Sequence, residues 1–330
     1  MNPPQLPLPP RMHTAAGKIR RIGVELEFIG LELETISRIV AQLFDGQIER
    51  ISAYEHRVTS ERLGTFQVEL DFHYLKELGR NPKPDSLLDE LSEEMLRSLA
   101  EGLVPLEVVA PPLAMTQLGE LELLVAALRK AGAQGTFSEP LNAFGLHLNP
   151  ELPDLESATL LAYLQAFCCL YDWLKEQGQI DLTRRLTPYI THFPKEYIQQ
   201  LLDPAYLPDQ ATLIDDYLAA NPTRNRALDL LPLFLHLDPE RLRAQLDDPR
   251  INARPTLHYR LPNCEIDRPD WGIHRAWGEW LQVEYLAADP PRLHAIATAY
   301  RNHLETSWFS HAEEWSKESE EWLITLPKNQ

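Results

Sequence analysis

Hydrophobic and polar residues alternate in several short segments of the chain. In residues 22–28 the apolar side chains of Ile22, Val24, Leu26 and Phe28 occupy every second position. Successive side chains of a strand point to opposite faces of a sheet, so these four share one face. The same alternation recurs in the segments 66–72, 106–110, 144–149 and 257–261. The pattern predicts a largely antiparallel sheet with one apolar and one polar face.

Other segments show helical spacing of their apolar residues. Spacings of three and four predict helices in residues 32–44, 85–99, 116–131 and 273–286, and a further, long helix in residues 292–322. Residues 48–60 and 65–72 flank Gly64 and predict an antiparallel hairpin. Strands and helices do not alternate as in a doubly wound fold, so we expect the α+β class.

The domain organisation follows from where prolines and helical patterns gather. Residues 1–16 are rich in proline and predict a mobile tail. Residues 17–330 predict a single domain, mostly helical at about 154–250 and again at about 272–322. The chain has 330 residues and 44% hydrophobic content, which is enough for a sizeable core.

The charge balance and cysteine content limit the partners and the compartment. The net charge is -18, with 31 Lys and Arg against 49 Asp and Glu, which argues against nucleic acid or an anionic membrane as a partner. Three cysteines do not suggest a disulfide framework. The longest apolar run, residues 228–237, is shorter than the ~20 residues that a membrane helix needs. We therefore expect a cytoplasmic protein.

The polar faces of the predicted strands carry an unusual set of side chains. A face that only meets water would also carry Thr, Lys and Ser. These faces instead offer carboxylates, histidines, an asparagine and an arginine: Glu25, Glu27, Glu69, Asp71, Glu107, His147, Asn149, His258 and Arg260.

Carboxylates on neighbouring strands repel one another unless cations intervene, so this face predicts a divalent metal site. Hard oxygen ligands suit Mg²⁺ or Mn²⁺, and Mg²⁺ held by carboxylates usually acts on substrate phosphates. Arg260 could neutralise a transferring phosphoryl group. Arg185, next to Arg184, is a second candidate for a phosphate, and the alternative is an arginine that meets only water at a helix end.

The motifs GVELEF, VELD, EVVAPPL, GLHLNP and HYRLPN, in this order, resemble the amidoligase family of the glutamine synthetase and glutamate-cysteine ligase superfamily. The resemblance implies a glutamine synthetase-like curved, largely antiparallel sheet covered by helices, with the active site on its concave face. It also implies ATP and Mg²⁺ (or Mn²⁺) as cofactors. The implied reaction joins a carboxylate to an amine, through an acyl phosphate.

The resemblance also implies roles for individual residues. It assigns metal binding to Glu25, Glu27, Asp71 and Glu107, with Glu107 also catalytic. His147 would lie near the β- and γ-phosphates as a ligand, and Arg260 would face the γ-phosphate as a catalytic and nucleotide-binding residue.

The chain departs from the family pattern at two positions. His258 stands where the family has a glutamate, so either an imidazole takes that metal position or one metal site is weakened. Ala110 replaces a serine. Two other classes use or inherit the same residues, namely a metal-dependent phosphohydrolase and a non-catalytic or degenerate amidoligase-like binding protein. The expected partners are small-molecule or peptide carboxylate and amine substrates, and a homo-oligomer is an open alternative.

Overall fold

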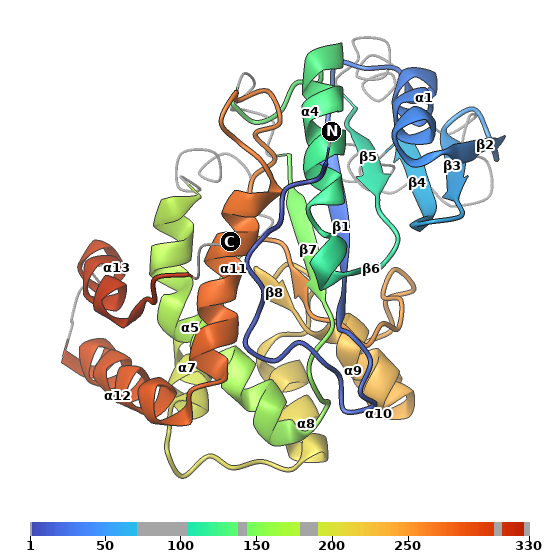
Figure 1. Ribbon diagram of the computed structural model, residues 1–330. Coiled ribbons are helices and arrows are strands. Elements are labelled where there is room, and N and C mark those ends of the chain that lie inside the picture. The colour runs from blue at the N-terminus through green and yellow to red at the C-terminus, as the bar shows by residue number, and fades with distance from the viewer. Residues whose placement is uncertain (1, 71–103, 138–143, 179–190, 307–311, 327–330) are drawn as a thin grey trace.

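A computed structural model describes residues 2–70, 104–137, 144–178, 191–306 and 312–326 of the chain (Figure 1). The fold is mixed α/β, with ten α-helices among the described residues. The strands are β1 (Arg21–Phe28), β2 (Gly46–Arg50), β3 (Glu55–Ser60), β4 (Gly64–Leu70), β5 (Leu106–Val109), β6 (Leu113–Ala114), β7 (Leu146–Pro150), β8 (Leu228–Asp229) and β9 (His258–Tyr259). The helices are α1 (Leu33–Phe44), α4 (Glu120–Ala131), α5 (Ser157–Gln177), α7 (Lys195–Leu201), α8 (Gln210–Ala220), α9 (Leu231–Leu237), α10 (Pro239–Gln245), α11 (Ile273–Ala287), α12 (Pro290–Thr306) and α13 (Ala312–Ser319).

The nine strands form one sheet in the order β2-β3-β4-β5-β1-β7-β9-β8, and β6 pairs with β1 outside this path. Every pair of these strands is antiparallel. The prediction of a largely antiparallel sheet is therefore confirmed. The sheet is open and does not curl, whereas the resemblance implies a curved one.

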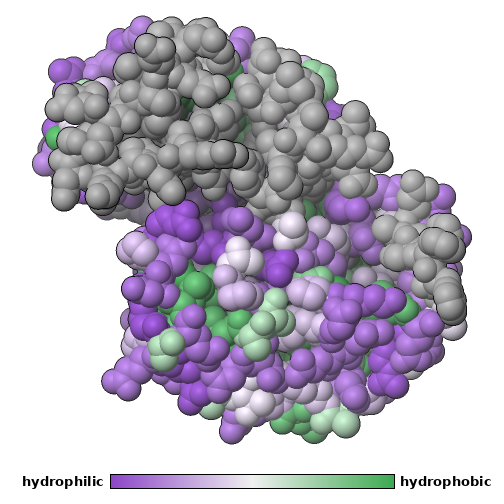
Figure 2. Space-filling view, turned by 180° about the vertical axis from the view of Figure 1, so that it is seen from behind, coloured by the Kyte–Doolittle hydropathy of each residue, from purple (hydrophilic) through white to green (hydrophobic). Residues whose placement is uncertain are grey.

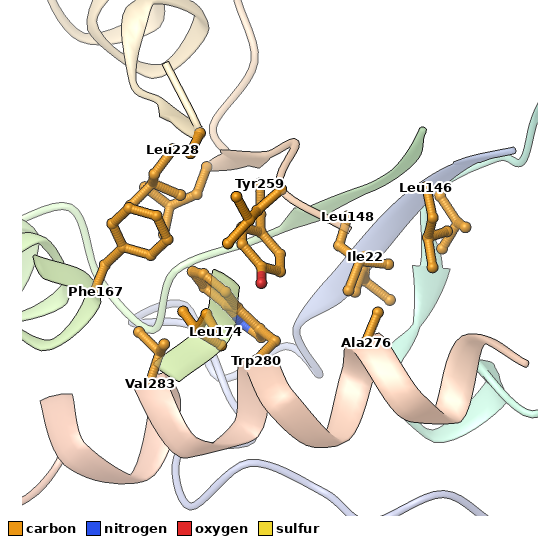
Figure 3. Close-up of a cluster of buried hydrophobic side chains, with 14 of the residues drawn as sticks. Ile22, Leu146, Leu148, Phe167, Leu174, Leu228, Tyr259, Ala276, Trp280 and Val283 are labelled. Carbon is orange, nitrogen blue, oxygen red and sulfur yellow. The ribbon is translucent and has the colours of Figure 1, made fainter. Parts of the chain in front are cut away.

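The apolar face of the sheet packs against helices and forms the core. Ile22, Leu146 and Leu148 lie over Ala276 and Trp280 of α11 (Figure 3). Helix α5 packs against α11, and α1 packs on β2, β3 and β4 at the other end of the sheet (Figure 1). Burying these side chains contributes about 1.5–3 kcal/mol for each large aliphatic residue. The alternation of β1 thus fixes which of its faces meets the helices.

The proline-rich N-terminal segment has defined contacts in the structure. It passes in front of α4 and α11 in Figure 1, and the indole Nε1 of Trp277 donates to the carbonyl oxygen of Pro7 at 2.7 Å. The hydroxyl of Tyr285 donates to the carbonyl of Leu8 at 3.2 Å. The expected mobility of residues 1–16 stays a prediction, and these contacts show where the segment lies.

Several predicted elements are confirmed, and one predicted strand is divided. The strand at 22–28 and the helices at 32–44 and 273–286 correspond to β1, α1 and α11. The predicted strand at 48–60 is split into β2 and β3, which residues 51–54 connect. The predicted helix at 292–322 contains α12 and α13, and residues 307–311 between them lie outside the described residues. The helix predicted at 85–99 lies outside the described residues. Within the described part of the chain, none of the helices has both the length and the apolar composition that crossing a bilayer requires.

Candidate metal and nucleotide site

The register of the central strands gathers the predicted polar side chains on one face of the sheet. Glu25 of β1 lies opposite His147 of β7, and Glu27 lies opposite Glu107 of β5. Glu107 also lies opposite Glu69 of β4. Directly opposed residues of antiparallel strands share a face, so these side chains lie side by side. Figure 2, seen from the side opposite to Figure 1, shows mainly hydrophilic residues among those described.

Glu25 is buried and accepts hydrogen bonds on both carboxylate oxygens. Its Oε1 accepts from Asn149 Nδ2 at 2.8 Å and from Arg254 Nη1 at 3.2 Å. Its Oε2 lies 2.9 Å from His147 Nδ1, and since a carboxylate only accepts, this nitrogen carries the proton. The protein therefore holds Oε1 with two donors and turns Oε2 towards the histidines.

A second histidine completes the surroundings of Glu25. His258 Nε2 lies 3.8 Å from Glu25 Oε2, and the His147 and His258 rings meet edge to face at 5.2 Å between centroids. Only 9% of His258 is exposed, and its Nε2 has no hydrogen-bond partner in the described structure. Buried polar atoms normally have partners, so a partnerless nitrogen indicates a position for a ligand.

The electrostatic balance differs between these two groups. Burial acts to raise the pKa of Glu25, but the hydrogen bond from His147 and the neighbouring His258 and Arg254 hold it well below its usual value. Burial lowers the pKa of His258 well below its usual value, against the opposing charge of Glu25. An anionic carboxylate beside a neutral imidazole is the protonation state in which both can bind a metal ion.

The side chains of Glu27 and His147 both lie close to the backbone of Gly145. Glu27 Oε2 accepts from the backbone nitrogen of Gly145 at 2.7 Å, and Glu27 Oε1 lies 3.7 Å from His147 Nε2. A β-carbon on Gly145 would lie 2.7 Å from His147 Nε2. This close approach explains why the GLH segment begins with a glycine, since any side chain would displace the imidazole.

Two groups of side chains have the spacing of metal ligands. The first is Glu25, His147 and His258, and the second is Glu27, Glu107 and His147; in each group one ligand atom from every residue lies within 4.8 Å of the others. The partnerless His258 Nε2 and the adjacent carboxylates fit a divalent cation. His147 belongs to both groups and lies between them.

Charged groups beyond this cluster lie on β8 and directly after β9. Arg260 Nη1 donates to the carbonyl of Arg224 at 3.0 Å, and Arg260 also helps to lower the pKa of His258. Asp229, opposite His258, is fully buried, and its Oδ2 has no hydrogen-bond partner in the described structure. Burial raises the pKa of Asp229 to about 6.

The structure therefore brings together five of the predicted residues, namely Glu25, Glu27, Glu107, His147 and His258. Arg260 directly follows β9, and its guanidinium donates to the backbone carbonyl of Arg224. Asp71 and Arg185 lie outside the described residues, and their roles stay predictions.

Sequence reasoning missed Arg254 and Asp229 and gave Asn149 no role. Arg254 precedes Pro255, and the residue before a proline favours extended backbone, so the even spacing from Arg254 to His258 was an available signal. Asp229 is the lone carboxylate in the apolar run of residues 228–237, which was a second signal.

Comparison with protein families agrees with this geometry. A family model described as "Putative amidoligase enzyme" matches residues 18–282, which contain all of the clustered side chains. No curated protein matches the sequence. The chain belongs to the amidoligase family.

Proposed function

We propose that the protein is an ATP-dependent ligase that joins a carboxylate to an amine through an acyl phosphate. The observation that carries the proposal is a cluster on the polar face, formed by the buried Glu25, His147 and His258 and the half-buried Glu27 and Glu107, in a chain of the amidoligase family. Burying a carboxylate beside two imidazoles costs free energy, and a sheet face that is only exposed to water does not require such a cluster. We further propose a glutamine synthetase-like arrangement, with this face as the active site.

The donor set fits Mg²⁺ or Mn²⁺ together with the phosphates of ATP. Glu27 and Glu107 would hold the metal through oxygen atoms, which both ions prefer. When bound, the metal would neutralise charge on the transferring phosphoryl group. Asp71 would add a further carboxylate, as the family pattern implies.

The reaction would have two steps, and individual side chains of the site would stabilise charge or bind near the phosphates. The substrate carboxylate attacks the γ-phosphorus of ATP, which forms an acyl phosphate and releases ADP, and the amine then displaces phosphate to form the amide. Arg260 and Arg185 would stabilise negative charge on the phosphoryl oxygens. His147 would lie near the β- and γ-phosphates, with its orientation fixed by Glu25. Water has to be excluded while the acyl phosphate exists.

The proposal is tested by measuring ADP release with panels of carboxylic acids and amines. We expect release that requires Mg²⁺, an acid and an amine together, and that falls in Glu107→Gln. Arg62→Gln, at an exposed pair with Glu120, is the matched control and should keep full activity. ADP release that is independent of any amine would instead support a phosphohydrolase. Absence of MgATP binding to the folded wild type would support a non-catalytic binding protein.

A further inference from the structure

The two groups of candidate ligands differ in their donor atoms. The group of Glu27, Glu107 and His147 offers two carboxylates and one imidazole, whereas the group of Glu25, His147 and His258 offers one carboxylate and two imidazoles. Imidazole nitrogen favours transition metals, and carboxylate oxygen favours Mg²⁺ and Mn²⁺. The two groups therefore differ in the metal that they suit.

The nitrogen-rich group also has the separation that a small ion requires. A tetrahedral ion with bonds of ~2.0–2.1 Å keeps its ligand atoms about 3.4 Å apart. Glu25 Oε2 and His258 Nε2 are 3.8 Å apart, and Glu25 Oε2 and His147 Nδ1 are 2.9 Å apart. A shift of about 0.5 Å in each pair would reach this separation, with the ion in place of the proton on His147.

The other contacts of Glu25 leave its second oxygen directed at this position. Asn149 and Arg254 both donate to Oε1. Oε2 therefore faces the imidazoles, and His258 Nε2 is buried without a hydrogen-bond partner in the described structure. His258 Nε2 and Glu25 Oε2 are therefore both available to bind the same ion.

We propose that Glu25, His147 and His258 form a site selective for a divalent transition metal, of the class of Zn²⁺, Co²⁺ and Fe²⁺, beside the oxygen-rich position at Glu27 and Glu107. The protein would then hold two different metals side by side. This inference deepens the proposed function, but the selectivity of the site is a property of the folded chain and is measurable without ATP.

The test compares Co²⁺ and Mg²⁺ binding to the metal-free full-length protein by calorimetry, with the visible absorption of bound Co²⁺ as a second readout. We expect wild type to bind one Co²⁺ at this site with a spectrum typical of four-coordinate geometry. His258→Glu, which exchanges nitrogen for oxygen, should lower the preference for Co²⁺ over Mg²⁺ by at least about tenfold. His258→Gln should lose the Co²⁺ spectrum, and circular dichroism shows whether each variant is folded.

His274→Gln is the matched control, because His274 forms an exposed pair with Glu122 that could bind Co²⁺ without forming a built site. This variant should keep the wild-type spectrum and selectivity. Equal selectivity of wild type and folded His258→Glu would overturn the inference, as would loss of the Co²⁺ spectrum in His274→Gln alone. Amine-dependent ADP release without Co²⁺ selectivity would reject this inference and leave the ligase proposal standing, and the reverse result would reject only the ligase.

Discussion

Two buried carboxylates lie on opposite sides of the sheet, and their surroundings differ. Glu284 of α11 is paired with Arg20 through two hydrogen bonds, of 2.7 and 2.9 Å, and also accepts from Tyr163 and Trp280. The remaining hydrogens of Arg20 go to backbone carbonyls of Arg11 and Glu151. Every polar group of this network has a partner inside the protein.

The cluster around Glu25 has the opposite character. Glu25 itself is bonded, but the neighbouring His258 Nε2, Asn149 Oδ1 and Asp229 Oδ2 are buried without hydrogen-bond partners in the described structure. Unpartnered polar atoms cost about 1–3 kcal/mol each. A fully partnered network indicates a structural role, whereas a cluster that leaves such atoms open indicates a binding site.

The largest expected effect comes from breaking the satisfied network. Arg20→Met should lower the free energy of unfolding by about 3–5 kcal/mol, because it leaves Glu284 buried without its cation. Chemical denaturation measures this change. Arg21→Met, which removes an exposed ion pair with Glu151, is the matched control and should cost at most about 1 kcal/mol. Equal losses in the two variants would contradict the structural role of the Arg20–Glu284 pair.

The second prediction removes charge from the open cluster. Glu27→Gln and Glu107→Gln should weaken Mg²⁺-dependent binding of a non-hydrolysable ATP analogue about 100-fold, equivalent to about 2.7 kcal/mol. The metal-free protein should keep its stability, because each change relieves repulsion between opposed carboxylates. Calorimetry and denaturation measure the two quantities. A large loss of stability together with unchanged nucleotide binding would mean that these carboxylates are structural.

The third prediction contrasts Asp229 with Glu284. Burial raises the pKa of Asp229 to about 6 from an ordinary 3.8, so ionisation destabilises the fold and wild-type stability falls as the pH rises through this window. Asp229→Asn should therefore gain about 1–3 kcal/mol above pH 6 and show little gain near pH 4. Glu284→Gln should lose stability at neutral pH, since Arg20 is left without its counter-ion. Unfolding curves across this pH range measure the free energy of unfolding of both variants. A change in the same direction in both would contradict the contrast.

The smallest expected effect is at Arg254. Its side chain is 44% exposed, and its bond to Glu25 is 3.2 Å long. Arg254→Met should change the free energy of unfolding by less than about 1 kcal/mol. Thermal unfolding compared with wild type checks this, and a loss as large as that of Arg20→Met would place Arg254 in a structural network instead.

The sequence predicted the faces of the strands but not their register. Alternation alone places Glu25 and Glu27 on one face of β1 and Val24 and Leu26 on the other face, and the structure agrees. The pairing of Glu25 with His147 and of Glu27 with Glu107 depends on how distant strands align, which no local pattern encodes.

The remaining differences have local physical causes. The turn within residues 51–54 was missed because polar and apolar residues are mixed on both sides of it, so one strand was predicted where β2 and β3 form a hairpin. Arg254 was missed because it lies in irregular backbone before β9, outside the alternating segment 257–261 from which the strand was predicted.

A crystal structure with Mn²⁺ and a non-hydrolysable ATP analogue tests the central claim most directly. The anomalous signal of Mn²⁺ locates the metal independently of the nucleotide. We expect metal density beside Glu27 and Glu107, with the analogue's phosphates over the same face of the sheet. Metal and nucleotide bound elsewhere on the folded protein, with this cluster unchanged, would contradict the account.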